Sequence, residues 1–489
     1  MTVQSARTLA DGIPSSRLVG DPACAITGVT HDSRRVHQGA LFAAVPGLHS
    51  DGREYVSDAL ASGASAVLLE PPAMRGTHAQ ILVSSAREAL PRAAELLYGR
   101  PSAAMPNIGI TGTNGKTTVA YLVTAVLESA GFRPALVGSL FSRFGGEKRE
   151  ALNTTPEASD LHRFWSEVQS RGADALVMEA SSHALLLHRV DRIGFSIGVL
   201  TNLTRDHLDY HPDLAAYRAA KTRLFAMLPR KGAAILPDSD PASEACARAT
   251  PARVITYGTS AQAGVRAADI HVSAAGIALS IEAGRRTYAV SSPLFGRFNV
   301  SNLLAAVAVA YALKLEPEQV AAGLSSVDSV PGRAQRVDCG QPFVVLNDFA
   351  HTPDALLRIL TAARELTRGK LHVVFGCGGD RDPGKRPMMG AVASEHADAI
   401  TVTSDNPRTE APEKIIADIV GGLRRREHVR VEADRELAIR AALARVEPGD
   451  TLVVAGKGHE RYQIVGTEKR RFDDATVLEA ELNRMGFSR

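Results

Sequence analysis

The run GITGTNGKTT, from Gly109 to Thr118, combines the residue types that bind a nucleotide phosphate. An apolar stretch precedes it, and the helical pattern VAYLVTAVLESAG follows it. Glycines let backbone N–H groups close around phosphate oxygens, and a helix N-terminus adds favourable partial charge. We therefore expect Lys116 to contact the β- and γ-phosphates and Thr117 to contact Mg²⁺. The common spacing GxxxxGK[ST] is not met, because Ile110 stands where the first glycine belongs. The alternative is a glycine turn with a surface lysine.

Carboxylate and imidazole groups follow two further apolar stretches. Glu179 lies in MEASSHALLLHR, and His207 lies in TRDHLDYH. Transfer of a phosphoryl group to a carboxylate brings two anions together, so such a site needs Mg²⁺ and basic side chains. We expect Glu179 to share a metal with Thr117 and His207 to bind a second one. A histidine that caps a turn is the alternative for His207, and the neighbouring His183 and His211 receive no role.

The elements that must hold these groups alternate between apolar runs and helical patterns, which predicts an α/β fold with parallel sheets. In open parallel sheets, ligands bind beyond the carboxyl ends of the strands, where the reactive residues of this chain lie. The predicted strands are 107–111, 173–178, 193–200, 370–375, 399–403 and 451–454.

The length of 489 residues suggests about three domains. The Pro- and Gly-containing stretches GRPSAAMP and VPGRAQR predict breaks that divide the chain into residues 1–101, 102–333 and 334–489. A net charge of +3 argues against a nucleic-acid partner. The four cysteines are scattered, and no signal peptide or membrane span is apparent. We expect reduced thiols, a cytoplasmic monomer, and no membrane partner.

Taken together, the motifs resemble those of the Mur ligase family over nearly the whole chain. TGTNGKTT is characteristic of Mur ligases and folylpolyglutamate synthetases, and HDSR, DFAHTP, GCGGDRD, DNPR and GKGHE occur in the family's order. The resemblance implies a three-domain α/β architecture with a UDP-substrate-binding domain, a central P-loop ATPase domain and a C-terminal Rossmann-like domain. It also implies ATP and Mg²⁺, and ligation of a carboxylate to an amine through an acyl-phosphate.

The resemblance assigns roles to individual residues. Lys221 lies in a helical pattern, where periodicity alone indicates a solvated surface residue. In Mur ligases the lysine at this motif position reacts with CO₂, and the resulting carbamate (N6-carboxylysine) supports the second metal. The catalytic residues implied are Lys116, Glu179, His207 and Lys221, and the metal ligands implied are Thr117, Glu179, His207 and carbamylated Lys221.

The implied ATP contacts are Gly112, Thr113, Asn114, Gly115, Lys116, Thr117, Thr118, Asn299, Asn302, Arg333 and Asp348. A helix N-cap is the alternative role for either asparagine. The implied UDP-substrate contacts are His31, Ser33, Leu48, His49, Ser50, Asn153, Thr154, Thr155, Ser181, Leu187 and Arg189. The sequence departs from the family at Leu187, where glutamine is usual, at Phe349, where tyrosine is more common, and in PGRAQ, which replaces PGRME.

The amino acid that is added follows from Arg408. Members that add the third peptide residue use meso-diaminopimelate or L-lysine, which differ by one distal carboxylate. Arginine suits that carboxylate because its guanidinium donates in bidentate geometry. The implied contacts are Arg381, Asp405, Asn406, Pro407, Arg408, Gly456 and Glu460. The expected reaction joins meso-diaminopimelate to the γ-carboxylate of UDP-MurNAc-L-Ala-D-Glu. In the alternative reading, Arg408 only pairs with Glu410 on the surface.

Several other functions stay open. A ligase that adds L-lysine, or one like folylpolyglutamate synthetase, would share the acyl-phosphate chemistry. The HDSR and GLHSDG motifs and the DNPR loop speak against the second of these. A P-loop NTPase or kinase would turn over ATP without an amine, and a non-catalytic UDP-sugar or ATP binder would not turn it over at all.

Overall fold

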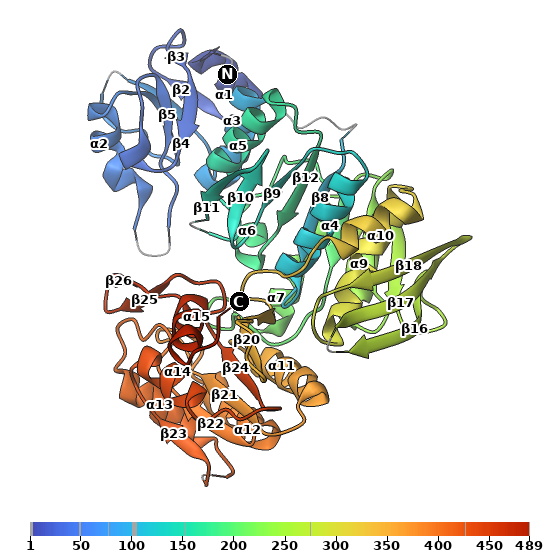
Figure 1. Cartoon of the computed structure of the whole chain (residues 1–489). Coiled ribbons are helices and arrows are strands. Elements are labelled where there is room, and N and C mark those ends of the chain that lie inside the picture. The colour runs from blue at the N-terminus through green and yellow to red at the C-terminus, as the bar shows by residue number, and fades with distance from the viewer. Residues whose placement is uncertain are drawn as a thin grey trace.

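Three large sheets, each flanked by helices, make up the computed structural model of the chain (Figure 1). The structure describes residues 3–47, 50–76, 78–99, 105–151, 153–273, 275–425 and 427–488. No helix among these residues is long and apolar enough to cross a membrane. The α/β class with parallel sheets, which the alternation of patterns predicts, is confirmed.

The N-terminal domain is built on a five-stranded sheet of order β2-β7-β6-β5-β4, parallel except for β2. Helices α1 and α3 cover one face of this sheet, and α2 covers the other. Its elements are β1 (Gln4–Ser5), α1 (Ala6–Gly12), β2 (Arg17–Val19), β3 (Ala25–Ile26), β4 (Gly28–Thr30), η1 (Ser33–Arg35), β5 (Ala40–Ala43), η2 (Gly52–Tyr55), α2 (Val56–Ala61), β6 (Ala64–Leu69), β7 (Ala79–Leu82) and α3 (Ala86–Tyr98).

The central domain has an eleven-stranded sheet of order β11-β10-β9-β12-β8-β13-β14-β15-β16-β17-β18. Its strands from β9 to β16 in this order run parallel, and antiparallel hairpins extend both edges. Its elements are β8 (Asn107–Thr111), α4 (Lys116–Ser129), β9 (Pro134–Val137), β10 (Phe141–Phe144), β11 (Glu147–Glu150), α5 (Ala158–Ser170), β12 (Ala175–Glu179), α6 (Ser182–Leu186), β13 (Ile197–Leu200), α7 (Leu214–Ala226), β14 (Ala233–Pro237), α8 (Ala242–Ala249), β15 (Arg253–Gly258), β16 (Val265–Ser273), β17 (Gly276–Ala283), β18 (Arg286–Ser292), α9 (Phe298–Ala312) and α10 (Pro317–Ser325).

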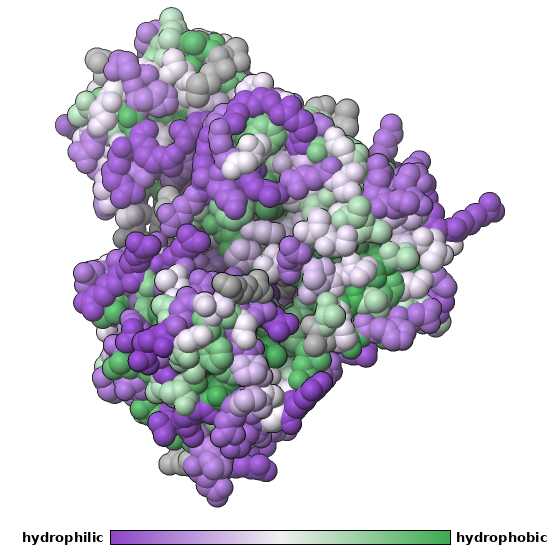
Figure 2. All heavy atoms as spheres, viewed as in Figure 1, coloured by the Kyte–Doolittle hydropathy of each residue, from purple (hydrophilic) through white to green (hydrophobic). Residues whose placement is uncertain are grey.

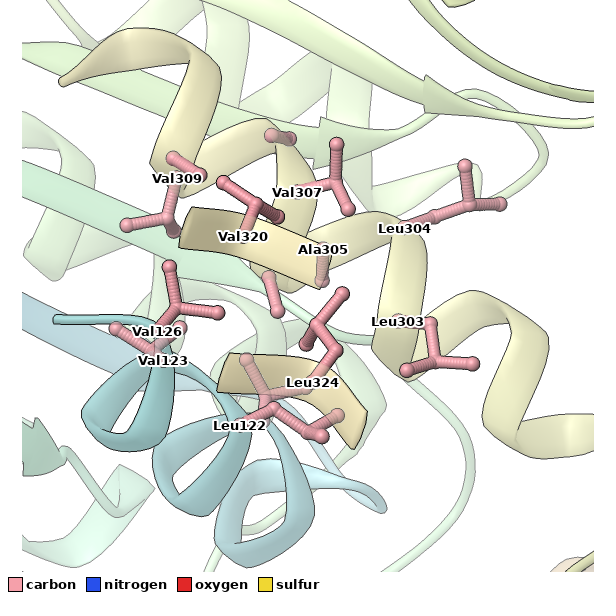
Figure 3. Packing of buried hydrophobic residues seen from close by; sticks show 14 of the residues in the cluster. Leu122, Val123, Val126, Leu303, Leu304, Ala305, Val307, Val309, Val320 and Leu324 are labelled. Carbon is pink, nitrogen blue, oxygen red and sulfur yellow. The ribbon is translucent and has the colours of Figure 1, made fainter. Parts of the chain in front are cut away.

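Alternating strand residues feed two separate cores in this domain, because successive side chains of a strand point to opposite faces. Val177 of β12 joins a core with α4, α9 and α10, whereas Leu176 and Met178 join a core with α5, α6, α7 and α8. Figure 3 shows the first core, where Leu122, Val123 and Val126 of α4 meet apolar residues of α9 and α10. Burial on both faces explains why these strands read as continuous apolar runs.

The C-terminal domain has a six-stranded sheet of order β19-β20-β24-β21-β22-β23, parallel except for β19. Helices α11, α12 and α13 pack on one face, and α14 and α15 on the other. Its elements are β19 (Gln335–Arg336), β20 (Val344–Asp348), α11 (Pro353–Leu366), β21 (Leu371–Phe375), α12 (Lys385–His396), β22 (Ala399–Val402), α13 (Pro412–Gly421), β23 (Val429–Val431), α14 (Arg435–Leu443), β24 (Thr451–Ala455), β25 (Tyr462–Val465), β26 (Glu468–Arg471) and α15 (Asp474–Arg484).

All six stretches predicted as strands form strands, with small differences at their ends. The largest difference is in the stretch 193–200, where β13 begins only at Ile197. Ile193 is buried in the core beside α5 and α6, so its apolar character reflects packing of a loop rather than a place in the sheet. On the outside, hydrophilic residues dominate the visible face of the molecule, with apolar residues in smaller patches between them (Figure 2).

Candidate active site

The glycine loop connects β8 to α4, as its sequence context predicts. Gly112 and Gly115 have positive φ values of 144° and 87°. A Cβ atom at Gly112 would lie 1.9 Å from Thr201 Oγ1, so only glycine fits this close approach. Lys116 starts α4, and its Nζ donates to the carbonyl oxygens of Gly112 and Thr113 at 2.9 and 2.8 Å. The lysine therefore points back over the loop and is not a surface residue.

Glu179 is the acceptor around which the loop side chains gather. It ends β12, is 1% exposed, and its Oε2 accepts from Thr117 Oγ1 at 3.0 Å. Ser139, which follows β9, donates to Glu179 through its backbone N at 2.8 Å and its hydroxyl at 3.1 Å. Arg333 Nη2 reaches Thr117 Oγ1 at 3.1 Å from the segment that leads into the C-terminal domain. Glu179 and Thr117 are thus adjacent, which the proposed shared metal requires.

Lys221 is buried rather than solvated, so the reading from helical periodicity alone is wrong. The residue is 2% exposed, and its Nζ donates to the carbonyl oxygen of Gly112 at 2.7 Å. Burial, together with the nearby charge of Lys116, drives the pKa of Lys221 well below its usual value. The Lys221 amine therefore lies beside the phosphate loop and favours its neutral form, which is the form that reacts with CO₂.

His207 lies at the start of a turn after β13 and has a φ of 53°. The carbonyl oxygen of His207 accepts from the backbone N of Tyr210 and of His211, so the turn is closed by the backbone and not by the imidazole. The His207 ring lies 4.9 Å from the His183 ring, centre to centre, and His183 also stacks on Tyr210 at 4.0 Å. Burial lowers the pKa of His207 to about 4 and that of His183 to about 3. Both rings are therefore neutral near pH 7.

A magnesium ion at the phosphate loop would need ligands from the nucleotide and from water as well as from the protein. Among the described residues, no group of three or more His, Cys, Asp or Glu side chains is placed to bind a metal by itself. The hydroxyl of Thr117 and the carboxylate of Glu179 do form a pair of hard oxygen donors at the phosphate loop. Mg²⁺ commonly takes one or two protein ligands of this kind and completes its shell with nucleotide phosphates and water. The residues present fit such a partial site.

The phosphate loop opens into a cavity of about 620 Å³ that continues between the central and C-terminal domains. Its lining also includes Pro241 of the β14–α8 connection, Phe298 and Asn302 of α9, and Ile359 of α11. Asn302 Nδ2 donates to Asn299 Oδ1 at 2.6 Å, and Asn299 Nδ2 donates to the carbonyl oxygen of Phe295 at 2.7 Å. Both asparagines lie inside α9, whose N-cap is Arg297, so the N-cap alternative is wrong.

The segment around β20 closes this cavity from the C-terminal side. Both carboxylate oxygens of Asp348 accept backbone N–H groups, from Ala334 and Ala350. Phe349 packs against Arg333, whose guanidinium lies 4.5 Å from the ring centre, and against His459 at 4.9 Å between ring centres. These ring contacts show that Phe349, where tyrosine is more common in the family, contributes by packing.

A second cavity of about 380 Å³ lies at the carboxyl ends of β20, β21, β22 and β24. This is the edge of a parallel sheet where ligands bind, and each of the four strands supplies residues to the wall. Arg381 follows β21, Asp405, Asn406 and Arg408 follow β22, and Gly456 and Glu460 follow β24. Pro407 completes the DNPR loop and is buried, but it does not line this cavity.

The guanidinium of Arg408 faces this second cavity without a carboxylate partner among the described residues. Its Nη1 donates to the carbonyl oxygen of Gly379 at 2.7 Å, and burial together with Arg381 lowers its pKa. Glu410 pairs with Arg386 at 2.7 Å and accepts the backbone N–H of Asp380. The alternative in which Arg408 pairs with Glu410 is therefore wrong, since Glu410 is already engaged elsewhere.

The two cavities meet, and four residues line both of them: Asp206, His207, Phe349 and His351. Asp206 follows β13, and its Oδ2 lies 3.5 Å from His207 Nε2 and 4.0 Å from His351 Nε2. Burial opposes ionisation of Asp206, but His207, His351 and Lys385 lower its pKa to about 2. The shared wall therefore carries a carboxylate at neutral pH between a phosphate-binding cavity and a cavity rich in charged groups.

The residues expected at the UDP-substrate come from the N-terminal and central domains. His31 Nδ1 is 3.0 Å from Ser159 Oγ, and Ser33 begins η1. Ser50 is exposed, whereas Leu48 and His49 lie outside the described residues. Asn153 is exposed near the start of the same loop as Thr154 and Thr155.

The loop with Thr154 and Thr155 extends this region to Glu179. Thr154 Oγ1 accepts from Ser139 Oγ at 3.1 Å, and Thr155 Oγ1 donates to the carbonyl oxygen of Glu179 at 2.8 Å. Ser181 caps α6, and Leu187 ends that helix. Arg189 contacts the carbonyl oxygen of Thr155 at 3.2 Å and forms an ion pair with Glu157 at 2.7 Å.

Sequence reasoning missed several residues of the site. Asp206 and His351 line both cavities, and Lys457 lies buried beneath the second one. Asn202 binds the phosphate loop by accepting the backbone N–H groups of Thr113 and Asn114. All four lie in or next to motifs of the sequence analysis, but residue type alone gave no reason to choose them over their neighbours.

Comparison with known families matches three consecutive parts of the chain. Residues 25–98 match the family described as Mur ligase family, catalytic domain. Residues 110–310 match the Mur ligase middle domain, and residues 332–458 match the Mur ligase, glutamate ligase domain. The order and spans of these matches agree with the three large sheets.

Individual relatives match nearly the full length. The UDP-N-acetylmuramoyl-L-alanyl-D-glutamate–2,6-diaminopimelate ligase of Solibacter usitatus is 44% identical over 470 residues, which is 94% of either chain. The ligase of the same name from Geobacter metallireducens is 44% identical over 502 residues, and the match covers 98% of either chain. A solved structure of such a ligase is 31% identical with a TM-score of 0.69, covering 99% of this chain and 100% of that one. These matches confirm the resemblance and the three-domain fold that the motifs predict, and the chain belongs to the Mur ligase family.

Proposed function

We propose that the chain is an ATP-dependent ligase that joins meso-2,6-diaminopimelate to the D-glutamyl γ-carboxylate of UDP-N-acetylmuramoyl-L-alanyl-D-glutamate, a step of peptidoglycan precursor synthesis. One observation carries this proposal: a phosphate-binding cavity and a charged cavity share the wall formed by Asp206, His207, Phe349 and His351. An acyl-phosphate made in the first cavity would lie next to an amine held in the second. Such proximity is the main requirement of a two-step ligation.

ATP would bind with its phosphates along residues 112–118 and its adenine end near Asn302, which Asn299 supports by a hydrogen bond, while Arg333 and Asp348 approach from the C-terminal side. Thr117 and Glu179 would hold one Mg²⁺, and His207 with carbamylated Lys221 would support a second. The metal, when bound, offsets the charge that develops on the transferred phosphoryl group. Lys116 adds a cation at the same oxygens.

The reaction proceeds in two displacements. A γ-carboxylate oxygen of D-glutamate attacks the γ-phosphorus of ATP, the bond to the bridging oxygen breaks, and an acyl-phosphate and ADP form. The amine nitrogen of the incoming amino acid then attacks the acyl carbon. The bond between that carbon and the phosphate oxygen breaks, inorganic phosphate leaves, and the nitrogen loses a proton. In the first step, the side chains of Lys116 and Arg333 would face the negative charge that accumulates on the transferred phosphoryl group.

Diaminopimelate, rather than L-lysine, is the amino acid that the second cavity suits. Arg408 has no carboxylate partner among the described side chains, and Arg381 is paired only with Asp209 at 3.9 Å. Two such guanidinium groups can bind two carboxylates, and a lysine substrate would supply only one. Asp405 and Glu460 would receive the amino groups on the other side of the cavity, with Asn406 and the Gly456 backbone beside them.

The UDP-linked substrate would extend from the N-terminal domain to Glu179. His31, Ser33 and the loop around Ser50 would contact the UDP portion, and Thr154, Thr155, Ser181 and Arg189 the peptide portion. The domain boundaries that we propose, near residues 102 and 334, fall between α3 and β8 and between α10 and β19. We also propose that the enzyme acts as a cytoplasmic monomer, which light scattering after size exclusion would test for the oligomeric state.

Phosphate release from ATP tests the function directly. The purified chain is given UDP-N-acetylmuramoyl-L-alanyl-D-glutamate with meso-diaminopimelate, with L-lysine, or with no amino acid. Release that requires both the nucleotide substrate and diaminopimelate supports the proposal. Release with L-lysine instead would keep the ligase and contradict the role of Arg408. Release without either substrate would indicate an NTPase.

A further inference from the structure

Lys457 is a fully buried cation at the floor of the second cavity. It follows β24 between two glycines, and its side chain is 0% exposed. Gly456 has a φ of 115°, and a Cβ atom there would lie 2.6 Å from Asp405 Oδ2. Gly458 has a φ of 53°, and a Cβ atom there would lie 2.7 Å from the carbonyl oxygen of Gly332. These two glycines let the backbone turn tightly, so that the lysine between them points inwards.

The Lys457 ammonium group determines how Asn406 and Glu460 are oriented. Its Nζ donates to Asn406 Oδ1 at 3.1 Å and to Glu460 Oε2 at 2.9 Å. Because Asn406 Oδ1 also accepts the backbone N–H of Ile464 at 2.9 Å, the amide nitrogen must point the other way. That nitrogen donates to the same Glu460 Oε2 at 2.8 Å. Two donors therefore meet at Oε2, and within the described part of the chain no hydrogen bond engages Glu460 Oε1.

The same cation balances the negative charge of the cavity floor. Asp405 and Glu460 are neighbouring carboxylates, and Asp405 is 7% exposed. Burial raises the pKa of Asp405, but Lys457 and then Arg435 lower it more, so the group stays ionised at neutral pH. Arg435 is already neutralised by Asp474, to which it donates twice at 2.8 Å. Lys457 is thus the main counter-ion of Asp405, and the same ammonium group forms an ion pair with Glu460.

We propose that Lys457 is a positioning residue for the amino-acid substrate, which holds Asn406 and Glu460 so that Glu460 Oε1 and Asp405 face an incoming ammonium group. The proposal rests on the proposed function, since it concerns the amino-acid cavity of that ligase. Lys457 itself does not compete for the substrate's carboxylates, because it is buried and two of its N–H bonds are already used. Arg408 and Arg381 remain the groups that face those carboxylates.

The test replaces Lys457 with methionine, which keeps the length of the side chain and removes the charge. In Lys457→Met we expect the KM for diaminopimelate to rise by about 10- to 100-fold, the range expected when a charge-assisted hydrogen bond is lost at a binding site. The KM values for ATP and for the UDP-linked substrate should stay within about twofold, because those substrates bind elsewhere. Lys457→Arg, which restores the charge, should recover part of the loss. Lys414→Met, on the exposed face of α13, is the matched control.

Three results would overturn the proposal. The first is an unchanged KM for diaminopimelate in a folded Lys457→Met enzyme, and the second is a fall in kcat with all three KM values unchanged. The third is a Lys457→Arg variant no better than Lys457→Met. If Lys457→Met does not fold, Lys457→Gln takes its place with the same expectations. A wild-type chain that shows no diaminopimelate-dependent turnover contradicts the proposed function instead, so the two failures are distinguishable.

Discussion

Replacement of Arg408 by methionine tests the amino-acid specificity most directly. Arg408 spends one N–H on the carbonyl oxygen of Gly379, and its other donors have no carboxylate partner among the described residues. Two charge-assisted hydrogen bonds to the distal carboxylate of diaminopimelate would contribute about 1.5 kcal/mol each, the lower end of the usual range, because the side chain is half-buried. At about 1.4 kcal/mol for each tenfold change, Arg408→Met should lower kcat/KM for diaminopimelate by about 100-fold.

The assay is phosphate release at saturating ATP and UDP-linked substrate, with diaminopimelate or L-lysine varied. We expect kcat/KM for L-lysine to be unchanged or to rise in Arg408→Met, because the variant removes a half-buried cation that has no partner in that substrate. The kcat/KM of Arg408→Lys for diaminopimelate should lie between those of the wild type and Arg408→Met, since lysine keeps the charge and loses the bidentate geometry. Arg424→Met, whose side chain is 72% exposed on the same domain, is the control. A loss below about threefold, or an equal loss for both amino acids, would refute the reasoning.

Three further predictions concern other buried charges. Lys221→Met should lower kcat by about 100-fold or more without loss of fold. The wild type should lose activity in CO₂-depleted buffer and regain it with bicarbonate, whereas the variant should not respond. An equal response of the variant would count against a carbamate on Lys221. Arg435→Met should destabilise its domain by about 3–5 kcal/mol in a urea titration, because it strands the fully buried Asp474, and the double variant with Asp474→Leu should lose less. Burial raises the pKa of Asp450, but the N–H groups of Glu447 and Lys370, with His372, lower it on balance. The ionised Asp450 therefore stabilises the fold fully above about pH 4, and this stabilisation is lost as the pH falls further. Asp450→Asn should thus show a smaller decrease of the melting temperature in acid than the wild type, and parallel curves for the two proteins would contradict this.

The parts of the site that a local motif builds by itself could be predicted from the sequence. The phosphate loop is one example, since strand, glycines, lysine and helix follow each other directly and the geometry is set within about ten residues. The placement of charged residues after β21, β22 and β24 is another, because parallel strands bring their carboxyl ends to one edge. In these cases the sequence order already determines which side chains can meet.

Burial of polar residues could not be predicted in the same way. Lys221 lies on a helix whose pattern does not separate it from a solvated lysine, and only the packing of α7 against the phosphate loop places its Nζ next to Gly112. Lys457 is similar, since its burial depends on two glycine turns and on contacts with the distant Asn406. A charged residue becomes buried only when partners from other elements satisfy it, and those partners are not visible from local periodicity.

The wall between the two cavities shows the same limit at the level of domains. Asp354, in the first turn of α11, accepts from Asn114 of the phosphate loop at 3.0 Å and from Arg358 of its own helix at 2.9 Å. Arg205, which precedes the shared Asp206, reaches Asp382 of the C-terminal domain at 3.3 Å. Both contacts join the central domain to the C-terminal domain, so they help to set the distance between the second cavity and the phosphate loop. The sequence motifs of one domain, taken separately, do not determine that distance. Ligation therefore depends on the contact between the central and C-terminal domains, whereas the sequence motifs indicate the structure of each domain separately.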